Sequence, residues 1–158
     1  MMNAGFTELL LVALALILVW IAWVDSQTYT ISNRINLIVA GLGLVYWWSI
    51  QLPIWPDGAI RLGVAAAVFG LFAIAFYIGM MGGGDVKLAA ALALWFTPHG
   101  TLSFIVIMSL AGGLLTLIVA GLHMKRGKEG RPEVPYGIAI AAGAMWLLAQ
   151  RFLNHFAG

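Results

Sequence analysis

The chain has 158 residues, of which 63% are hydrophobic and only 9% are charged, and its mean hydropathy is +1.00. A soluble domain of this length cannot bury so much apolar surface, so lipid must be the solvent for most of the chain. The absence of cysteine excludes disulfide bonds, thiol catalysis and cysteine-ligated zinc. The formal net charge of +2 gives no indication of nucleic-acid binding. The composition predicts an integral membrane protein.

Six apolar segments follow one another along the chain, and each predicts a helix. They span residues 6–24, 35–52, 59–81, 86–96, 101–122 and 136–153. No basic residue precedes the first segment, which favours a retained helix over a cleaved signal peptide. The breaks are short and leave no room for a soluble domain. We expect an all-α membrane protein of about six transmembrane helices, with residues 1–158 forming one membrane-embedded domain and no separate soluble domain.

The distribution of basic residues predicts the orientation of these helices. If the helices alternate in direction, the loops after the first, third and fifth helices lie on one side. That side holds six basic residues, which are Arg34, Lys87, Lys125, Arg126, Lys128 and Arg131. The other side holds only Arg61 and Arg151. The positive-inside rule makes the first side cytoplasmic and places both termini outside. The charged loop 123–135 is interpreted as a topology determinant that also contacts anionic lipid.

Two aspartates occupy positions where charge is costly. Asp25 follows the first apolar run, and Asp85 follows the glycines at 82–84 just before the fourth. Ionisable groups at or within the membrane tend to mark functional sites. The alternating topology brings both carboxyl groups to the cytoplasmic side. Two carboxyl groups that meet can share one proton and act together as general base and general acid.

The fourth segment is short, which indicates where Asp85 lies. Its eleven residues, 86–96, rise only about 16 Å as a helix, against a hydrocarbon core of roughly 30 Å. Asp85 is therefore expected below the cytoplasmic surface, beside irregular or closely packed glycine backbone. Such backbone is tolerated at membrane depth where it lines a cavity or is buried in protein. We expect a water-accessible pocket around Asp85.

Helix position predicts the roles of the two aspartates. Asp85 lies at a helix N-terminus near Lys87, and both features favour the ionised form. Asp25 lies at a helix C-terminus, where the helix dipole disfavours negative charge. The prediction is therefore Asp85 as base and Asp25 as acid. Asn33 either caps the next helix or orients a carboxyl group, and capping is the preferred interpretation.

Three short motifs resemble those of a known family and follow one another along the chain in the order that the family has them. The segment Gly82–Asp85 fits the Gly-x-Gly-Asp motif of intramembrane aspartyl proteases. Its continuation Val86–Leu88 resembles the type IV prepilin peptidases, especially the short forms that serve tight-adherence (Flp-type) pili. Ile31–Asn33 follows Asp25 at the spacing of the family's Ile-Pro-Asn, and Val134–Ala139 resembles the Pro-Tyr/Phe-Gly segment that opens its last helix.

The resemblance implies a membrane aspartyl endopeptidase that removes the leader peptide of Flp-like prepilins at the cytoplasmic face of the bacterial inner membrane. It implies Asp25 and Asp85 as catalytic residues. The supporting or substrate-binding residues that it implies are Gly82, Gly84, Lys87, Asn33, Pro135, Tyr136 and Gly137. The expected partners are a prepilin and the lipid bilayer, with no nucleic acid. No metal or other cofactor is expected, because the three histidines show no ligand spacing.

The chain also departs from the family pattern. Ser32 stands where the family usually has proline, and the cysteine-bearing cytoplasmic insertion of the longer, bifunctional prepilin peptidases is missing. Proteolysis is therefore expected and N-methylation is not. The absence of Tyr-Asp and Pro-Ala-Leu motifs argues against the presenilin branch. An alternative of a different class is a small transporter or channel component that uses Asp25 and Asp85 as a proton relay.

Overall fold

The computed structural model describes residues 2–125 and 134–157, and the regular structure in these ranges is entirely helical. The elements are α1 (Met2–Thr28), α2 (Asn33–Ser49), the short π-helical turn η1 (Ile54–Gly58), α3 (Ala59–Tyr77), α4 (Gly83–Ala93), α5 (Pro98–Lys125) and α6 (Tyr136–Ala157). The predicted all-α class is confirmed. The central part of the predicted basic loop, with Arg126, Lys128 and Arg131, lies outside the described residues.

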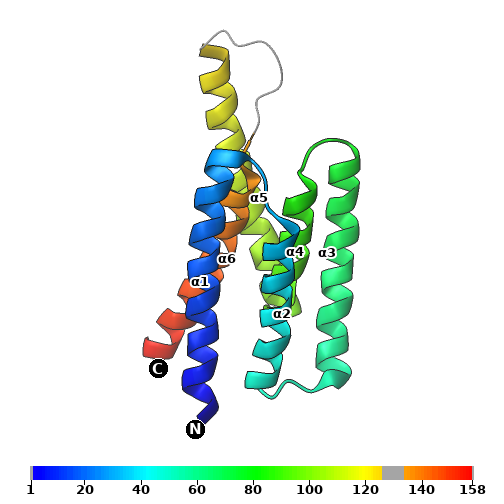
Figure 1. The fold of residues 1–158 in the computed structure, drawn as a ribbon, viewed down its shortest axis with the longest axis vertical. Coiled ribbons are helices and arrows are strands. Elements are labelled where there is room, and N and C mark those ends of the chain that lie inside the picture. Colours follow the sequence, from blue (N-terminus) through cyan, green and yellow to red (C-terminus); the bar gives the residue numbers. More distant parts are fainter. Residues whose placement is uncertain (1, 126–133, 158) are drawn as a thin grey trace.

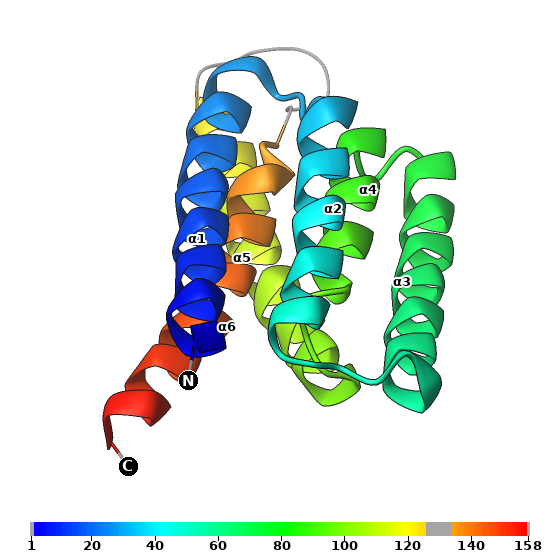
Figure 2. The ribbon, with the colours of Figure 1, turned by 60° about the horizontal axis from the view of Figure 1, so that its bottom comes forward.

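The helices alternate in direction along the bundle (Figure 1). Both termini lie at one end, together with the connection from α2 to α3. The connection from α1 to α2, the turn from α3 to α4 and the start of α6 lie at the other end (Figures 1 and 2). The six predicted apolar segments thus correspond to six helices, each antiparallel to the next along the chain. The end of α1 lies at the same end of the bundle as the start of α4.

Four of the helices are long and apolar enough to cross a membrane. They cover Ala4–Thr28, Ile54–Tyr77, Pro98–Lys125 and Tyr136–Asn154. α2 and α4, with 17 and 11 residues, are shorter than a typical span. The protein is therefore a multi-pass membrane protein by length and composition, with two short helices among longer ones.

α4 is the centre of the bundle and packs against α2, α3 and α6. Apart from the half-buried Ala90, its alanines and leucines are almost completely enclosed, and small side chains allow its neighbours to approach closely. Trp95, just beyond α4, donates its indole N–H to the Val39 carbonyl at 3.0 Å and stacks on Tyr46 with ring centroids 5.1 Å apart. This short helix is held rigidly because it is buried on nearly every side.

Several helix ends differ from the predicted ones. α1 continues to Thr28, so Asp25 lies within its final turn and not after it. α4 begins at Gly83, so two of the three glycines are helical. α5 begins at Pro98, since the first turn of a helix tolerates a residue without an N–H. Each difference extends a helix into polar or glycine-rich sequence that apolar patterning alone does not detect.

Candidate active site

Asp25 is held at the end of α1 by the start of α6. Its side chain is only 2% exposed, and Oδ2 accepts a hydrogen bond of 2.8 Å from the Gly137 N–H. Gly137 is the second residue of α6, where backbone N–H groups have no partner within the helix. A Cβ at this glycine would lie 2.7 Å from the same oxygen. Only glycine lets the helix end approach the carboxylate this closely.

Asp85 is the third residue of α4 and is 8% exposed. Its Oδ2 accepts a hydrogen bond of 3.2 Å from the N–H of Gly82, the residue that precedes the helix. An acidic side chain that reaches back to the first N–H of its own helix stabilises the helix N-terminus. The side chain is thus held in its conformation by the start of its own helix.

The structure brings the two aspartates together although they lie on α1 and α4. The Asp25 carboxyl group is close enough to act electrostatically on that of Asp85. Asp25 lies beside two helix ends, because the C-terminus of α1 is not its only neighbour. The N-terminus of α6 also points at it through Gly137, and a helix N-terminus favours negative charge. Helix dipoles therefore no longer distinguish the two aspartates, and the assignment of base and acid stays a prediction.

A cavity of about 680 Å³ opens beside Asp85, as the short fourth segment predicts. It is lined by Thr28, Tyr29, Thr30, Gly79, Met80, Met81, Gly82, Asp85, Thr116, Val134 and Tyr136. The walls thus come from the α1–α2 connection, the α3–α4 turn, α5 and the start of α6. Asp25 is not part of the lining, so a ligand in this cavity meets the Asp85 carboxyl group first.

Gly84 allows α4 to touch the connection from α1 to α2. A Cβ at this position would lie 2.6 Å from the carbonyl oxygen of Ile31, closer than real Cβ contacts. Among the glycines of this region, the positive φ belongs to Gly79, at 74°, in the turn before the motif. Gly84 is therefore required for a close approach of two backbones, next to the carboxyl group of Asp85.

Asn36 is a site residue that the sequence analysis missed. It is 5% exposed, and its Nδ2 donates to the carbonyl oxygen of Gly84 at 3.0 Å. Among the described residues its Oδ1 is buried without a hydrogen-bond partner. The available signal was one amide in the otherwise apolar start of segment 35–52, since a buried polar side chain needs a partner.

Two predictions for the residues around α2 are wrong. Ser32 caps α2, because its hydroxyl accepts from the Ile35 N–H at 3.4 Å, so Asn33 is not the cap. Asn33 Oδ1 instead accepts a hydrogen bond of 2.8 Å from Lys87 Nζ. Lys87 is exposed and lies on a different side of α4 from Asp85, because residues two positions apart on a helix do not face each other. The contact with Asn33 ties α2 to α4 at the outer edge of the site.

The segment that opens α6 also contacts α5. Pro135 is buried directly before the helix, and the Tyr136 hydroxyl lies 3.3 Å from Thr116 Oγ1. A Cβ at Gly112 would meet the Tyr136 ring at 3.2 Å, so α5 also provides a glycine for close packing. Of the residues predicted around the aspartates, Gly82, Gly84, Pro135, Tyr136 and Gly137 lie at the site, whereas Asn33 and Lys87 lie at its edge.

Comparison with known proteins shows which family the chain belongs to. The model of the type IV leader peptidase family matches residues 12–117, a range that contains both aspartates. The chain belongs to this family. A prepilin leader peptidase/N-methyltransferase from Xanthomonas campestris pv. campestris is 28% identical over 143 residues. The match covers 87% of this chain and 48% of that relative, so the chain spans about half of the relative's length. No solved structure matches the chain.

Proposed function

We propose that this type IV leader peptidase family member is an aspartyl endopeptidase that cleaves the leader peptide from type IV prepilins. The proposal rests on two buried carboxyl groups, Asp25 and Asp85, that lie at the same end of the bundle within electrostatic range of each other, with a cavity beside Asp85. Family membership supports a leader-peptidase role. The buried pair supports the aspartic chemistry, because two adjacent carboxyl groups cannot both ionise easily and so share one proton.

Each carboxyl group of the pair exchanges a proton twice in the reaction, once when the diol forms and once when it breaks down. The ionised carboxylate takes a proton from a water molecule, and the resulting hydroxide attacks the scissile carbonyl carbon. The protonated carboxyl group gives its proton to the carbonyl oxygen, which forms a tetrahedral diol. The first carboxyl group then donates the proton it received to the leaving nitrogen, the second takes back a proton from the diol, and the C–N bond breaks. One water molecule is consumed, and the pair returns to a single shared proton.

The hydrogen bonds favour Asp25 as the ionised base. Its carboxylate accepts from an N–H at the start of another helix at 2.8 Å, and hydrogen bonds to the charged form favour that form. Asp85 accepts a longer bond of 3.2 Å from its own helix start and faces the cavity. Asp85 is therefore positioned to carry the proton toward a substrate carbonyl.

The proposed substrate is a Flp-like prepilin with a leader peptide on the cytoplasmic side and an apolar helix in the inner membrane. In this arrangement the end of the bundle that holds the aspartates faces the cytoplasm, and the chain acts as one membrane-embedded peptidase domain. The chain contains no cysteine, which supports peptidase activity without the N-methylation activity that its bifunctional relative's name includes.

Asparagine substitutions test the pair. Asp25→Asn and Asp85→Asn should each abolish cleavage of a co-expressed, tagged Flp-like prepilin, seen as a size shift on a gel. Residues that act as a unit lose nearly all activity when either one is removed. Asp57→Asn is the matched control, because this exposed carboxyl group follows α2 at the opposite end and should leave cleavage unchanged. Substantial cleavage by either single variant would contradict the aspartic mechanism, and a proton relay would then be the better function.

A further inference from the structure

A buried arginine lies at the end of the bundle opposite the aspartates. Arg61 is the third residue of α3 and is 8% exposed, although a charged side chain is costly to bury without a partner. One N–H of its guanidinium donates to the Trp95 carbonyl oxygen at 3.4 Å, near the limit for a hydrogen bond. A guanidinium carries five N–H donors. Within the described ranges, no second protein acceptor meets the remaining donors of Arg61.

A second arginine lies close to the first. Arg151 of α6 donates to the Tyr46 hydroxyl, and its guanidinium lies 5.5 Å from the centre of the Tyr46 ring. It is near enough to Arg61 for the two positive charges to repel. Arg61 of α3 and Arg151 of α6 thus place two positive charges in the wall of one cavity, and an anion in that cavity would be attracted to both.

Both arginines line one cavity of about 440 Å³. The hydroxyl groups in its wall are already engaged. The Ser103 hydroxyl donates to the His99 carbonyl oxygen at 3.2 Å, and Thr97 Oγ1 accepts from the Gly100 N–H at 3.1 Å. The wall also holds the side chains of His99, Gln150 and Asn154, and the two guanidinium groups carry its permanent positive charges.

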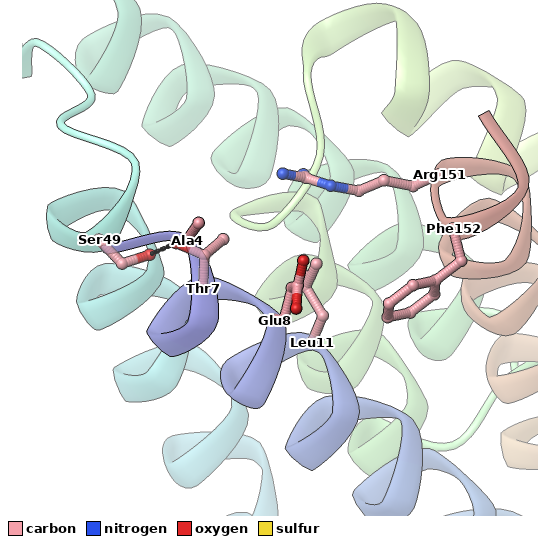
Figure 3. Close-up of a pocket in the computed structure, with 7 residues that line it drawn as sticks. All are labelled: Ala4, Thr7, Glu8, Leu11, Ser49, Arg151 and Phe152. Atoms are coloured by element: carbon pink, nitrogen blue, oxygen red, sulfur yellow. Dashed lines mark hydrogen bonds between the residues drawn. The ribbon is translucent and has the colours of Figure 1, made fainter. Parts of the chain in front are cut away.

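The nearest carboxyl groups do not neutralise the arginines by direct contact. Asp57 acts on Arg61 electrostatically from an exposed position in η1. Glu8 lines an adjoining cavity of about 240 Å³ that also has Arg151 in its wall. Figure 3 shows Arg151 and Glu8 reaching into this space from α6 and α1. Among residues 4–125 and 134–154, no carboxylate forms an ion pair with either guanidinium.

We propose that Arg61 and Arg151 form a binding site for a phosphate group, a site separate from the aspartates and independent of the peptidase function. Planar guanidinium forks bind the oxygens of a phosphate in pairs, and two of them at one cavity offer more donors than the protein itself uses. The phosphate is that of an anionic lipid headgroup or a free phosphate ion, and the cavity has room for a headgroup.

The test measures binding to the purified full-length chain in neutral detergent, with two probes. Native mass spectrometry counts retained phosphatidylglycerol, with phosphatidylcholine as the lipid that lacks net charge, and calorimetry measures inorganic phosphate. Binding of phosphatidylglycerol alone identifies the headgroup as the source, and binding of inorganic phosphate identifies the free ion. Either result supports the site. Binding of neither probe overturns it.

Variants assign the binding to the arginines. Arg151→Gln should weaken binding by about tenfold or more, because a hydrogen bond to a charged group is lost. Arg34→Gln, on an exposed arginine at the opposite end of the bundle, is the matched control and should bind like the wild type. Glu8→Gln should bind more tightly, since a repelling carboxylate is removed. Arg61→Lys keeps the buried charge but removes the fork and should also weaken binding.

The decisive variant is Arg151→Gln, because Arg151 is exposed and its loss is compatible with folding. Elution of each variant as a single folded species by size exclusion is the condition for comparing affinities. Wild-type affinity of Arg151→Gln would overturn the proposal even if Arg61→Lys does not fold. Weaker binding by Glu8→Gln would also overturn it, because an anion site should not need that carboxylate.

Discussion

At the scale of single residues, the aspartates depend on glycines that bring other backbones within contact distance. Gly137 places the start of α6 against Asp25, and Gly84 places α4 against the carbonyl oxygen of Ile31. At both positions a Cβ would lie less than 3.0 Å from another atom. The glycines therefore set the distances between chain segments, and not only the flexibility of the turn in which they lie.

Gly137→Ala tests this dependence at Asp25. The added methyl group would lie 2.7 Å from Oδ2, so the carboxylate or the start of α6 must shift. Since shifts near 1 Å at a catalytic group reduce rates by about 100-fold, we expect a loss of that order in cleavage rate per folded molecule. Gly113→Ala is the control, because a Cβ there meets nothing within 4 Å. Equal rates for both variants would show that the contact with Asp25 is dispensable.

Individual residues were predictable to different degrees. Asp25, Asp85 and the motif glycines could be found because charge and glycine runs are unusual in apolar sequence. Lys87 was misplaced because sequence proximity to Asp85 says nothing about which side of a helix each residue occupies. Asn36 was missed because a single amide carries no motif, and only the structure shows its Gly84 partner.

At the scale of elements, α2 and α4 are joined by a side chain-to-backbone hydrogen bond. Asn36 on α2 donates to the Gly84 carbonyl oxygen at the first turn of α4, one residue before Asp85. The Lys87–Asn33 contact joins the same two helices nearer the surface. We therefore propose Asn36 as a positioning residue, because its contact reaches Asp85 only through the backbone of α4.

Asn36→Leu tests whether the hydrogen bond from Asn36 positions Asp85 for catalysis or only stabilises the fold. It keeps the approximate volume but removes the donor, so the Gly84 carbonyl oxygen loses its side-chain hydrogen bond, at a cost of about 0.5–1.5 kcal/mol. We expect kcat to fall about tenfold with little change in KM, because the first turn of α4 loses its fixed position and not its substrate contacts.

Thr101→Val provides the matched control for this variant. Thr101 is 1% exposed, and its hydroxyl has no partner among the described residues. Replacing it with an isosteric apolar side chain should leave kcat unchanged and leave stability equal or higher. Cleavage kinetics on purified protein and thermal unfolding measure both quantities. A fall in kcat for Thr101→Val equal to that for Asn36→Leu would attribute the loss to general packing.

The helices themselves were predicted well, and their ends were not. Apolar runs identify a buried or lipid-facing helix, but ends depend on capping groups and on glycines that the pattern excludes. α4 therefore began three residues earlier than predicted, at Gly83, and α1 extended four residues further, to Thr28. These two ends are also where the aspartates lie, so the prediction was least accurate at the site.

At the scale of the whole molecule, alternation of helices was predictable and their arrangement was not. Short breaks require antiparallel neighbours, and the positions of the termini in Figure 1 agree with this. The central position of α4 could not be predicted, because beyond Asp85 and Lys87 in its first turns the helix is apolar on all sides and gives no preferred face. For the same reason, the distribution of apolar residues does not predict which helices contact one another.

Chemical labelling tests the proposed orientation across the inner membrane. The chain has no cysteine, so single-cysteine variants give an unambiguous signal. Gln27→Cys, at the end that holds the aspartates, should react with a membrane-impermeant thiol reagent only after the membrane is opened. Ile54→Cys, 84% exposed at the other end, should react in intact spheroplasts. The reverse pattern would place the aspartates away from a cytoplasmic leader peptide.

The hydrogen bond between Gly137 and Asp25 joins residues 112 positions apart, and this separation has a consequence for biosynthesis. Both aspartates leave the ribosome well before α6 does. A nascent chain that has inserted only its first five helices therefore contains both acidic groups but lacks the N–H that holds Asp25. In the proposed mechanism the active site is complete only after translation of α6, so partly synthesised chains should not cleave other membrane proteins.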